Sequence, residues 1–443
     1  MTSLRLFQRR FTRLCAAALV GGFALFSFSG CDSLDVANPN APEPEVVSIQ
    51  ALATGLEGGL RAGMGVYWRV NGIFARDLYY FEPADPRYTG ELYTGPLDPG
   101  GFLLLTPWSG RYRAIGQARI LIEQAEARGL GEAEQAGIRG YANTLIAHQL
   151  LLALNYLGEN GIKIEFSDQV DVPFVTQEEG YAEINRYLDE ALTDLQSAGD
   201  AFPFSLSGGF AGFDTPAGFA QFNRAIRARV AIYQGDAGAA LSALEGSFIS
   251  DGDLNGGVYH TFGAGSGDRL NPMFEVPTAD FVKLRATPEF VADAEAGDQR
   301  VASKVLDRGE ELPASPGSAN GLASSVVVTT ASSSSGSYPV IRNEELLLIR
   351  AEANILNGDL DAAETDINAV RSAAGLGNVE LDDENALDQL LFERRYSLFA
   401  EGHRWVDLRR YDRLGTLPTP EVGEGITSQI FEQWPRPNSE VPG

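Results

Sequence analysis

The sequence predicts an all-α fold of packed helix pairs, with long irregular loops and a few short strands. Apolar residues recur at helical spacing over most of the chain. Two segments also repeat one layout, in which a helix, a Gly-Asp turn and an Ala-rich helix follow one another: residues 226–241 (IRARVAIYQGDAGAAL) and 349–364 (IRAEANILNGDLDAAE). A chain of 443 residues can bury a large core, so one helical domain is expected over residues 46–443.

The two repeated segments resemble tetratricopeptide units, in which small Ala residues let paired helices pack closely. Their spacing along the chain is irregular, so a long open solenoid is not predicted. Helix pairs are expected over about residues 107–250 and 338–414, with a loop-rich region at 251–337 between them. Gly, Ser, Asn and Pro dominate that region, and a short run such as SSVVVTT is typical of a strand.

Apolar periodicity and the positions of Gly and Pro divide the domain into elements. Residues 46–80 show helical spacing interrupted by Gly, and a Gly- and Pro-rich loop follows at 81–102. Beyond that loop, apolar residues fall on one face of each segment, as in an amphipathic helix. The helices predicted there cover residues 107–129, 133–158, 181–199, 216–236, 237–250, 343–359 and 360–376.

The first thirty residues predict a lipoprotein signal peptide (1–30). A basic start with four Arg residues precedes the apolar run LCAAALVGGFALFSF, which has the length of a signal-peptide core and is short for a membrane span. The following FSGC resembles a bacterial lipobox, with Phe28 where Leu is usual. It predicts cleavage before Cys31 and a lipid on that thiol; an ordinary secretory signal is the alternative. Residues 31–45 are expected to be a flexible tether.

Composition excludes some partners and some chemistries. The 60 acidic residues exceed the 34 basic ones, and the net charge of −26 repels phosphate backbones, so nucleic acid is not an expected partner. Cys15 and Cys31 are the two cysteines of the chain. A thiolate metal site, a Cys nucleophile or a disulfide is therefore not expected in the body of the protein.

The sequence holds no motif that predicts catalysis. His148, His260 and His403 are far apart in the sequence, and their spacing does not suggest a metal site. The segment DGDLNG (251–256) opens like a calcium-binding loop, but Phe262 stands at the twelfth position, where a bidentate Glu is needed. A plain turn is expected there. We predict no enzyme activity, no cofactor and no metal centre, and the sequence leaves a structural calcium open.

Loop tyrosines are the candidate ligand-binding residues. Tyr79, Tyr80, Tyr88 and Tyr93 lie in or beside the Gly- and Pro-rich loop, and Tyr259 lies in the later irregular region. Aromatic rings offer flat apolar faces that stack on sugar rings or peptide groups. The alternative is that these rings pack the loop onto the helices.

The segment FERRYSLFAEGHRWVDLRRY (392–411) concentrates three acids, one His and five Arg. Its composition suggests an active site, but it supplies no nucleophile or open substrate space. Arg forms forked hydrogen bonds with carboxylates, which suits a packed junction between helices. We interpret His403 and Trp405 as parts of a buried hinge, and we expect Arg partners for the three acids, Glu393, Glu401 and Asp407.

Several motifs together resemble the SusD/RagB family of outer-membrane nutrient-binding lipoproteins. They are FSGC at 28–31, PWSGRYRAIGQAR at 107–119, YPVIRNEELLLIRAEANILNGDLDAAETDINAVRSAAGL at 338–376, the segment at 392–411 described above and WPRPNSEV at 434–441. The segment at 392–411 is similar to the family's Glu-Arg-Arg, Glu-Gly-His-Arg-Trp and Asp-Leu-Arg-Arg hallmark. The resemblance touches most of the chain, and its C-terminal hundred residues are the most specific part.

The resemblance implies an α-helical fold of four tetratricopeptide-like pairs with irregular loops on one side. It also implies a lipoprotein anchored to the outer membrane and exposed at the cell surface. Such a protein partners a SusC-like TonB-dependent outer-membrane transporter, captures a glycan or peptide, and delivers it without breaking a bond or using a cofactor.

Two other functions stay open from the sequence. A helical-repeat lipoprotein can instead be a scaffold for an envelope complex, which a smooth concave helical groove would favour. A helical glycoside hydrolase is the other rival, and it requires two carboxyl groups roughly 5–10 Å apart in an open cleft.

Overall fold

The computed structural model describes residues 44–166, 172–309, 312, 319–423 and 425–440. Cys31 and most of the predicted tether lie outside these residues. The chain divides into two units, Met1–Ser48 and Ile49–Gly443. The described part of the first unit contains one short 3₁₀ turn, η1 (Pro44–Val46), in which the Val47 N–H donates to the Pro44 carbonyl at 3.2 Å.

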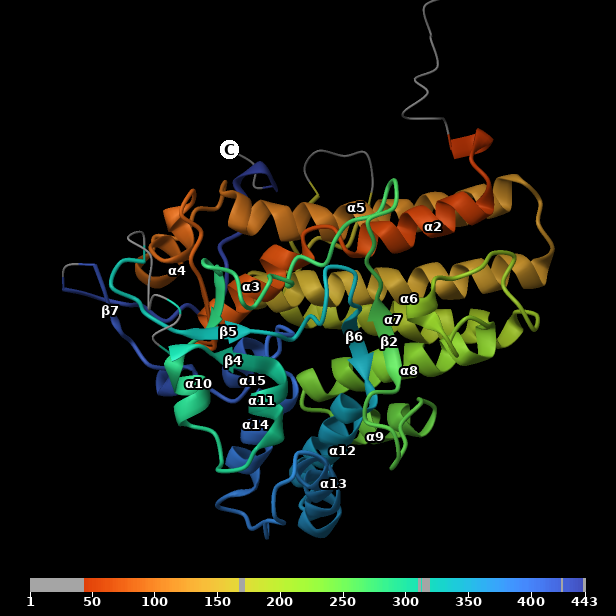
Figure 1. Ribbon diagram of the computed structural model, residues 1–443. Helices are drawn as coiled ribbons and strands as arrows, with labels where there is room; N and C mark the ends of the chain where they lie inside the picture. Colours follow the sequence, from red (N-terminus) through yellow and green to blue (C-terminus); the bar gives the residue numbers. More distant parts are fainter. Residues whose placement is uncertain (1–43, 167–171, 310–311, 313–318, 424, 441–443) are drawn as a thin grey trace, which may run out of the picture. The chain divides into compact units, whose positions relative to one another are not determined.

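The second unit is helix-rich, with short strands and long loops, so the predicted fold class is confirmed (Figure 1). Its helices are α2 (Ile49–Leu60), α3 (Met64–Phe74), α4 (Glu91–Thr94), α5 (Phe102–Ala127), α6 (Glu132–Leu157), α7 (Gln177–Ser197), α8 (Pro216–Tyr233), α9 (Ala237–Glu245), α10 (Pro288–Ala292), α11 (Gln299–Lys304), α12 (Asn343–Asn357), α13 (Leu360–Ala373), α14 (Ala386–Ser397) and α15 (Arg404–Arg410).

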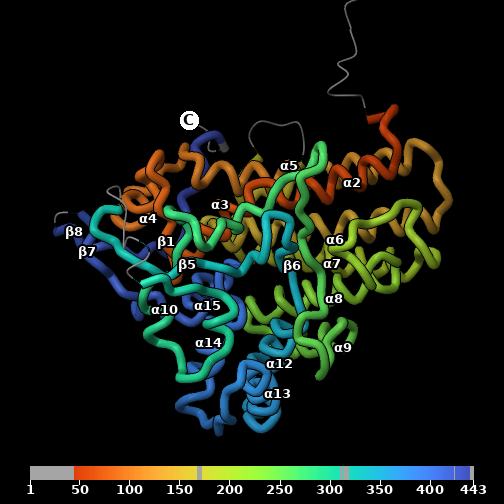
Figure 2. The backbone as a smooth tube through the Cα atoms, in the orientation of Figure 1, coloured from red at the N-terminus to blue at the C-terminus, as the bar shows by residue number. Residues whose placement is uncertain are grey.

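Helices that are adjacent in the sequence pack against each other. Helix α5 lies against α6, α6 against α7, α7 against α8, and α8 against α9, and Figure 1 shows α5 to α8 stacked with similar axis directions. The pair α12–α13 follows the loop-rich region and packs beside α8 and α9 (Figure 2). Ala- and Leu-rich faces form these contacts, as the apolar periodicity predicted.

The two repeated segments adopt the same turn. Asp236 and Asp359 each accept a hydrogen bond from the backbone N–H three residues on, at 2.9 Å and 3.2 Å, and so cap α9 and α13. The preceding Gly235 and Gly358 have φ values of 72° and 77°, a left-handed conformation that glycine adopts without strain. The sixteen-residue sequence match therefore corresponds to one local structure used twice.

Helix α5 begins five residues before the predicted start at Pro107. A proline inside a helix lacks the N–H that would bond to the carbonyl four residues earlier, here that of Leu103. The Tyr156 hydroxyl donates to this carbonyl at 2.8 Å instead. The helix can therefore run through Pro107, because a side chain from α6 satisfies the freed acceptor.

Short strands lie in and around the loop-rich region. They are β1 (Leu78–Tyr80), β2 (Gly257–His260), β3 (Leu284–Ala286), β4 (Val305–Asp307), β5 (Val326–Val328), β6 (Tyr338–Arg342), β7 (Glu421–Val422) and β8 (Ile426–Thr427). One sheet has the order β1-β3-β5-β4, and β2 pairs with β6 and β7 with β8. The helical spacing predicted up to Tyr80 thus ends at Phe74, and SSVVVTT contains β5 as expected.

One large core and two smaller clusters, one of them formed by Val282, Leu312 and Val327, hold the described part of the second unit together. The large core joins α2, α3 and α5 to α8 with the loop-rich region, and the other small cluster lies among α12, α13 and α14. In the described part of the chain, no helix combines the length and apolar character that a membrane crossing requires.

Candidate functional site

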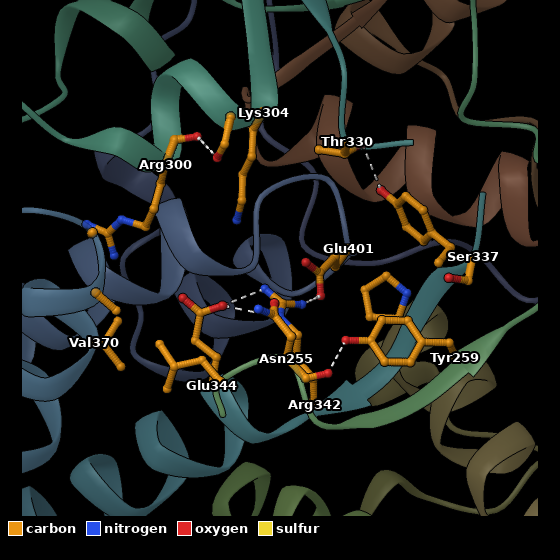
Figure 3. Close-up of a pocket in the computed structure, with 16 residues that line it drawn as sticks. Asn255, Tyr259, Arg300, Lys304, Thr330, Ser337, Arg342, Glu344, Val370 and Glu401 are labelled. Atoms are coloured by element: carbon orange, nitrogen blue, oxygen red, sulfur yellow. Dashed lines mark hydrogen bonds and ion pairs between the residues drawn. The ribbon is translucent and has the colours of Figure 1, made fainter. Parts of the chain in front are cut away.

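A pocket of about 430 Å³ lies where the loop-rich region meets the last helix pairs (Figure 3). Strands β2 and β6, helix α11, the start of α12 and the end of α13 supply its walls. Its volume is in the range of small-molecule sites in proteins. It is lined by Leu254, Asn255, Tyr259, Arg300, Ser303, Lys304, Thr330, Ser337, Tyr338, Pro339, Arg342, Glu344, Val370, Ala373, Ala374 and Glu401.

The floor of the pocket contains a buried ion cluster centred on Arg342, the last residue of β6. Its guanidinium donates to the Glu344 carboxylate at 2.8 Å and 3.2 Å and also pairs with Glu401, as Figure 3 shows. Burial opposes ionisation of Glu344, but the charges of Arg342 and Lys304 lower the pKa of this carboxyl. Burial raises the pKa of Glu401, and the charge of Arg342 offsets only part of that effect.

Lys304, at the end of α11, reaches into the same floor (Figure 3). Its Nζ donates to the Tyr396 carbonyl at 2.6 Å and to the Ser397 carbonyl, which Arg342 also contacts. These carbonyls end helix α14, where the helix dipole attracts cations. Burial lowers the pKa of Lys304 to about 8.

Arg300 is the third cation of the pocket. Its guanidinium pairs with Asp298 at 2.7 Å and with Glu393 at 2.6 Å. It also donates to the Ser397 hydroxyl at 3.1 Å. Arg300 therefore ties α11 to α14 and supports one wall.

The rim of the pocket is neutral and rich in hydroxyl groups. Tyr259 is half-buried and stands opposite Pro339 in the ladder between β2 and β6, and its hydroxyl donates to the Asn255 carbonyl at 2.5 Å. The side chains of Asn255, Ser303 and Ser337 are exposed to solvent. The rim therefore combines an aromatic ring with polar groups that can exchange water for a ligand.

The other four predicted tyrosines lie elsewhere and are buried as two ring pairs. Tyr80 meets Tyr88 edge-on at 4.7 Å between ring centroids, and Tyr79 lies 6.3 Å from Tyr93. Each of the four is at most 6% exposed. Their burial is the arrangement expected if they pack the loop onto the helices, and the structure does not bring them to the pocket that contains Tyr259.

The acids of the segment 392–411 all pair with arginine, as predicted. Their partners come from several elements: Glu393 pairs with Arg300 and Arg371, Glu401 with Arg342, and Asp407 with Arg394 and Arg410. His403 and Trp405 are buried among them. The segment thus forms a packed junction, while a hinge motion at this place stays a prediction.

The three histidines, far apart in the sequence, line one small buried cavity of about 30 Å³. The Tyr233 hydroxyl and His403 Nδ1 lie 3.1 Å apart, and Gln149 Nε2 lies 3.3 Å from His148 Nδ1. Burial lowers the pKa of His260 to about 3 and that of His403 to about 4. Sequence spacing could not reveal this cluster, because three separate elements bring the rings together.

Two further observations bear on the site. Among the described residues, no group of three or more His, Cys, Asp and Glu side chains is arranged to hold a metal ion.

A second pocket of about 650 Å³ lies between the start of α7, α15 and residues 430–433. Tyr181, Arg409 and Arg410 are among its lining residues.

Sequence reasoning missed most of the residues that build the first pocket. Lys304 and Arg300 lie on α11, a helix of six residues inside the loop-rich region, too short for apolar periodicity to show. One available signal was rarity, since Lys304 is one of three lysines in the chain. Arg342 lies in the motif at 338–376, and nothing in that motif indicates a pocket.

Comparison with known proteins bears directly on the predicted family. Residues 324–439 match the sequence model of the SusD family, and this range contains much of the pocket and the whole segment 392–411. The resemblance to the SusD family is confirmed. None of the curated proteins matches the chain by sequence.

Solved structures of SusD-like proteins share the fold over most of the chain. A SusD-like carbohydrate-binding protein from Bacteroides fragilis superposes with a TM-score of 0.68 at 15% identity, covering 88% of this chain and 97% of its own. A SusD superfamily protein from Bacteroides thetaiotaomicron gives 0.63 at 19% identity, with coverages of 82% and 89%. Surface glycan-binding protein A from Bacteroides uniformis gives 0.61 at 16% identity, with coverages of 81% and 88%. At these identities the likeness establishes the fold.

Proposed function

We propose that this protein is a cell-surface lipoprotein that binds a nutrient, a glycan or a peptide, and passes it to a SusC-like TonB-dependent outer-membrane transporter. The observation that carries the proposal is the match of residues 324–439 to the SusD family. The SusD-like fold supports it, since two of the similar structures are described as carbohydrate-binding or glycan-binding proteins. A glycan is therefore the ligand to test first.

The proposal includes anchoring through a lipid on Cys31 after removal of residues 1–30. The lipobox-like FSGC and the Pro- and Asn-rich residues after it support this step. Acylation would keep the protein at the outer membrane. The polar rim around Tyr259 supports a binding role for this face.

The proposal also assigns binding without catalysis. The two carboxylates in the pocket, Glu344 and Glu401, both pair with Arg342 and help to hold β6 against α14. A glycosidase needs one carboxyl group as an acid and another as a base or nucleophile beside the scissile bond. Glu344 and Glu401 are both paired with the buried Arg342, so neither is placed to act as the acid, the base or the nucleophile of a glycosidase.

One experiment tests anchoring and partnership together. The full chain and the variant Cys31→Ser would be expressed in the native host and captured from detergent-solubilised membranes through a C-terminal tag. The intact chain is expected in the outer-membrane fraction with a barrel transporter bound, and Cys31→Ser is expected outside that fraction. Recovery of the intact chain without a transporter, but with other envelope proteins, would favour the scaffold instead.

Binding is tested separately with purified protein and a panel of oligosaccharides and peptides. Saturable binding with no shortening of the ligand is the expected result. Release of shorter sugars during incubation would contradict the non-catalytic assignment and favour the glycoside hydrolase.

A further inference from the structure

The cations that line the pocket of about 430 Å³ all have partners inside the protein. Arg342 pairs with Glu344 and Glu401, and Arg300 pairs with Asp298 and Glu393, which lie behind the wall. Lys304 donates to the carbonyls that end α14. Each cation of the pocket therefore already has a partner.

This arrangement works against a charged ligand. A ligand carboxylate or sulfate that reached the floor would meet Arg342, which is already paired with Glu344 and Glu401, and these two acids would repel it. A ligand ammonium would meet two acids that share Arg342. Either ion would lose its water without gaining a free counter-charge, and such a transfer is unfavourable.

The same arrangement suits an uncharged ligand with many hydroxyl groups. The exposed side chains of Asn255, Ser303 and Ser337 line the rim. The Asn255 amide and the Ser337 hydroxyl can both donate and accept hydrogen bonds, and the Ser303 hydroxyl, which donates to the Arg300 carbonyl at 2.9 Å, can accept them. Tyr259 adds a flat ring beside them, and an aromatic ring packs against the apolar face of a sugar. Ala373 and Ala374 at the end of α13 supply small apolar contacts on another wall.

We propose that this pocket is the site for an uncharged saccharide, whose ring stacks on Tyr259 and whose hydroxyls bond to Asn255, Ser303 and Ser337. The inference rests on the proposed function and narrows it to neutral glycans. It places the ligand between β2, β6 and α11, away from the tyrosines near the loop at 81–102. The proposal excludes uronate-rich glycans and charged peptides as ligands of this pocket.

The test compares binding of charged and uncharged ligands. The full chain, purified in detergent at pH 7, would be titrated by calorimetry with neutral gluco-, manno-, xylo- and galacto-oligosaccharides. Oligogalacturonate and its methyl ester form a matched pair, because the ester removes the negative charge and keeps the sugar. Blocked peptides with neutral and with charged side chains complete the panel.

At least one neutral oligosaccharide is expected to bind, and the galacturonate methyl ester is expected to bind no more weakly than the acid. Tighter binding of the acid would overturn the assignment to uncharged ligands. Binding of peptides in place of every oligosaccharide would overturn it as well. Failure of the whole panel to bind would count against the proposed function itself.

Two variants then test the location of the site. Ser303→Trp places a large side chain at the pocket wall, and Tyr259→Ala removes the stacking ring, while Tyr259→Phe keeps it. Each of the first two is expected to weaken binding of the neutral oligosaccharide at least tenfold, and Tyr259→Phe is expected to retain most of it. Unfolding midpoints equal to that of the parent chain would show that the variants are folded.

Matched controls lie outside the pocket on α7. Ser197 is an exposed serine and Tyr187 a half-buried tyrosine, so Ser197→Trp and Tyr187→Ala repeat the same chemical changes elsewhere. Both controls are expected to bind like the parent chain. If glycan binding survived Ser303→Trp and Tyr259→Ala unchanged, the pocket would be the wrong place while the proposed function would stand.

Discussion

Arg229 and Glu345 form a two-pronged ion pair that joins α8 to α12, the first helices of the two similar helix pairs. The Nε and Nη2 atoms of Arg229 on α8 each lie 2.6 Å from a different carboxylate oxygen of Glu345 on α12. The side chains are 3% and 1% exposed. Arg229 also donates to the Val340 carbonyl at 2.8 Å, so the same guanidinium holds β6, the strand that ends in the pocket floor.

Removing one partner of this pair should destabilise the protein strongly. Glu345→Ala would leave the Arg229 charge buried without its carboxylate, a change that typically costs about 3–5 kcal/mol of unfolding free energy. The double variant Arg229→Met/Glu345→Leu should recover much of that loss, because no unpaired charge remains. Urea unfolding of Arg229→Met, Glu345→Leu, their double variant and the parent chain measures the coupling.

An exposed pair provides the control for this prediction. Glu183 pairs with Arg186 on α7, and the Arg186 side chain is 46% exposed. Glu183→Ala should therefore change the unfolding free energy by less than about 1 kcal/mol. Equal losses for Glu345→Ala and Glu183→Ala would show that the buried pair does not join the helix pairs as argued.

Lys304 should titrate well below the usual range of lysine. Burial in the pocket floor lowers its pKa to about 8, whereas Lys283 gains Glu82 as a partner and its pKa is raised. The chain has three lysines, so their side-chain NMR signals can be assigned by substituting each in turn. One signal with a midpoint near pH 8, absent in Lys304→Met, is the expected result.

The sign of the stability effect follows from the same shift. Between about pH 8 and the ordinary lysine value near 10.4, the unfolded chain holds a proton on Lys304 that the folded protein has released. Raising the pH through this window should therefore increase the contribution of Lys304 to the unfolding free energy. A midpoint for Lys304 near that of an exposed lysine would contradict the burial on which the prediction rests.

Much of the helical framework could be predicted from the sequence, because its signals are local. Apolar spacing located α5 to α8, and the two Gly-Asp turns located the helix pairs α8–α9 and α12–α13. The first residues of some helices could not be predicted from apolar spacing. The start of α5 depends on the Tyr156 hydroxyl, which reaches the Leu103 carbonyl from another helix. The start of α7 depends on a capping box between Thr176 and Glu179, which the sequence displayed but apolar spacing alone overlooked.

The pocket could not be predicted, because its parts come from distant segments. The sequence identifies Tyr259 as an aromatic ring in an irregular region. Lys304 and Arg342 line the same pocket, and both are held there by carbonyls at the end of α14, a third segment. The loop tyrosines Tyr80 and Tyr88 had the same composition signal as Tyr259 and are buried. The sequence shows where the aromatic residues are. Whether a ring is buried or exposed depends on the elements that pack over it, and these come from other parts of the chain.

The three buried histidines should make the protein sensitive to mild acid. Burial is the main cause that lowers the pKa of each ring, to about 3 for His260, to about 4 for His403 and well below the usual value for His148. The charged groups nearby are, for His148, Arg229 and Arg111; for His260, Arg111 and Arg61; and for His403, Glu345, Asp407, Arg229 and Arg394.

The direction of this effect follows from proton binding by the two states. Below pH 6.5 the unfolded chain protonates its histidines, while the folded protein keeps His403 neutral down to about pH 4. Stability contributed by the neutral ring is therefore complete above pH 6.5 and is lost as the pH falls toward 4. At pH 5 the loss for one such ring is about 2 kcal/mol relative to neutral pH.

Urea unfolding at pH 7 and pH 5 measures this loss in the parent chain and in His403→Gln. Because Gln carries no titrating proton, the fall in unfolding free energy between the two pH values should be smaller in the variant by about 2 kcal/mol. The difference between pH values is the readout, so a lower stability of the variant at both pH values does not affect it. An equal fall in both proteins would show that His403 is protonated in the folded state at pH 5, and hence that water reaches the cavity where the three rings meet.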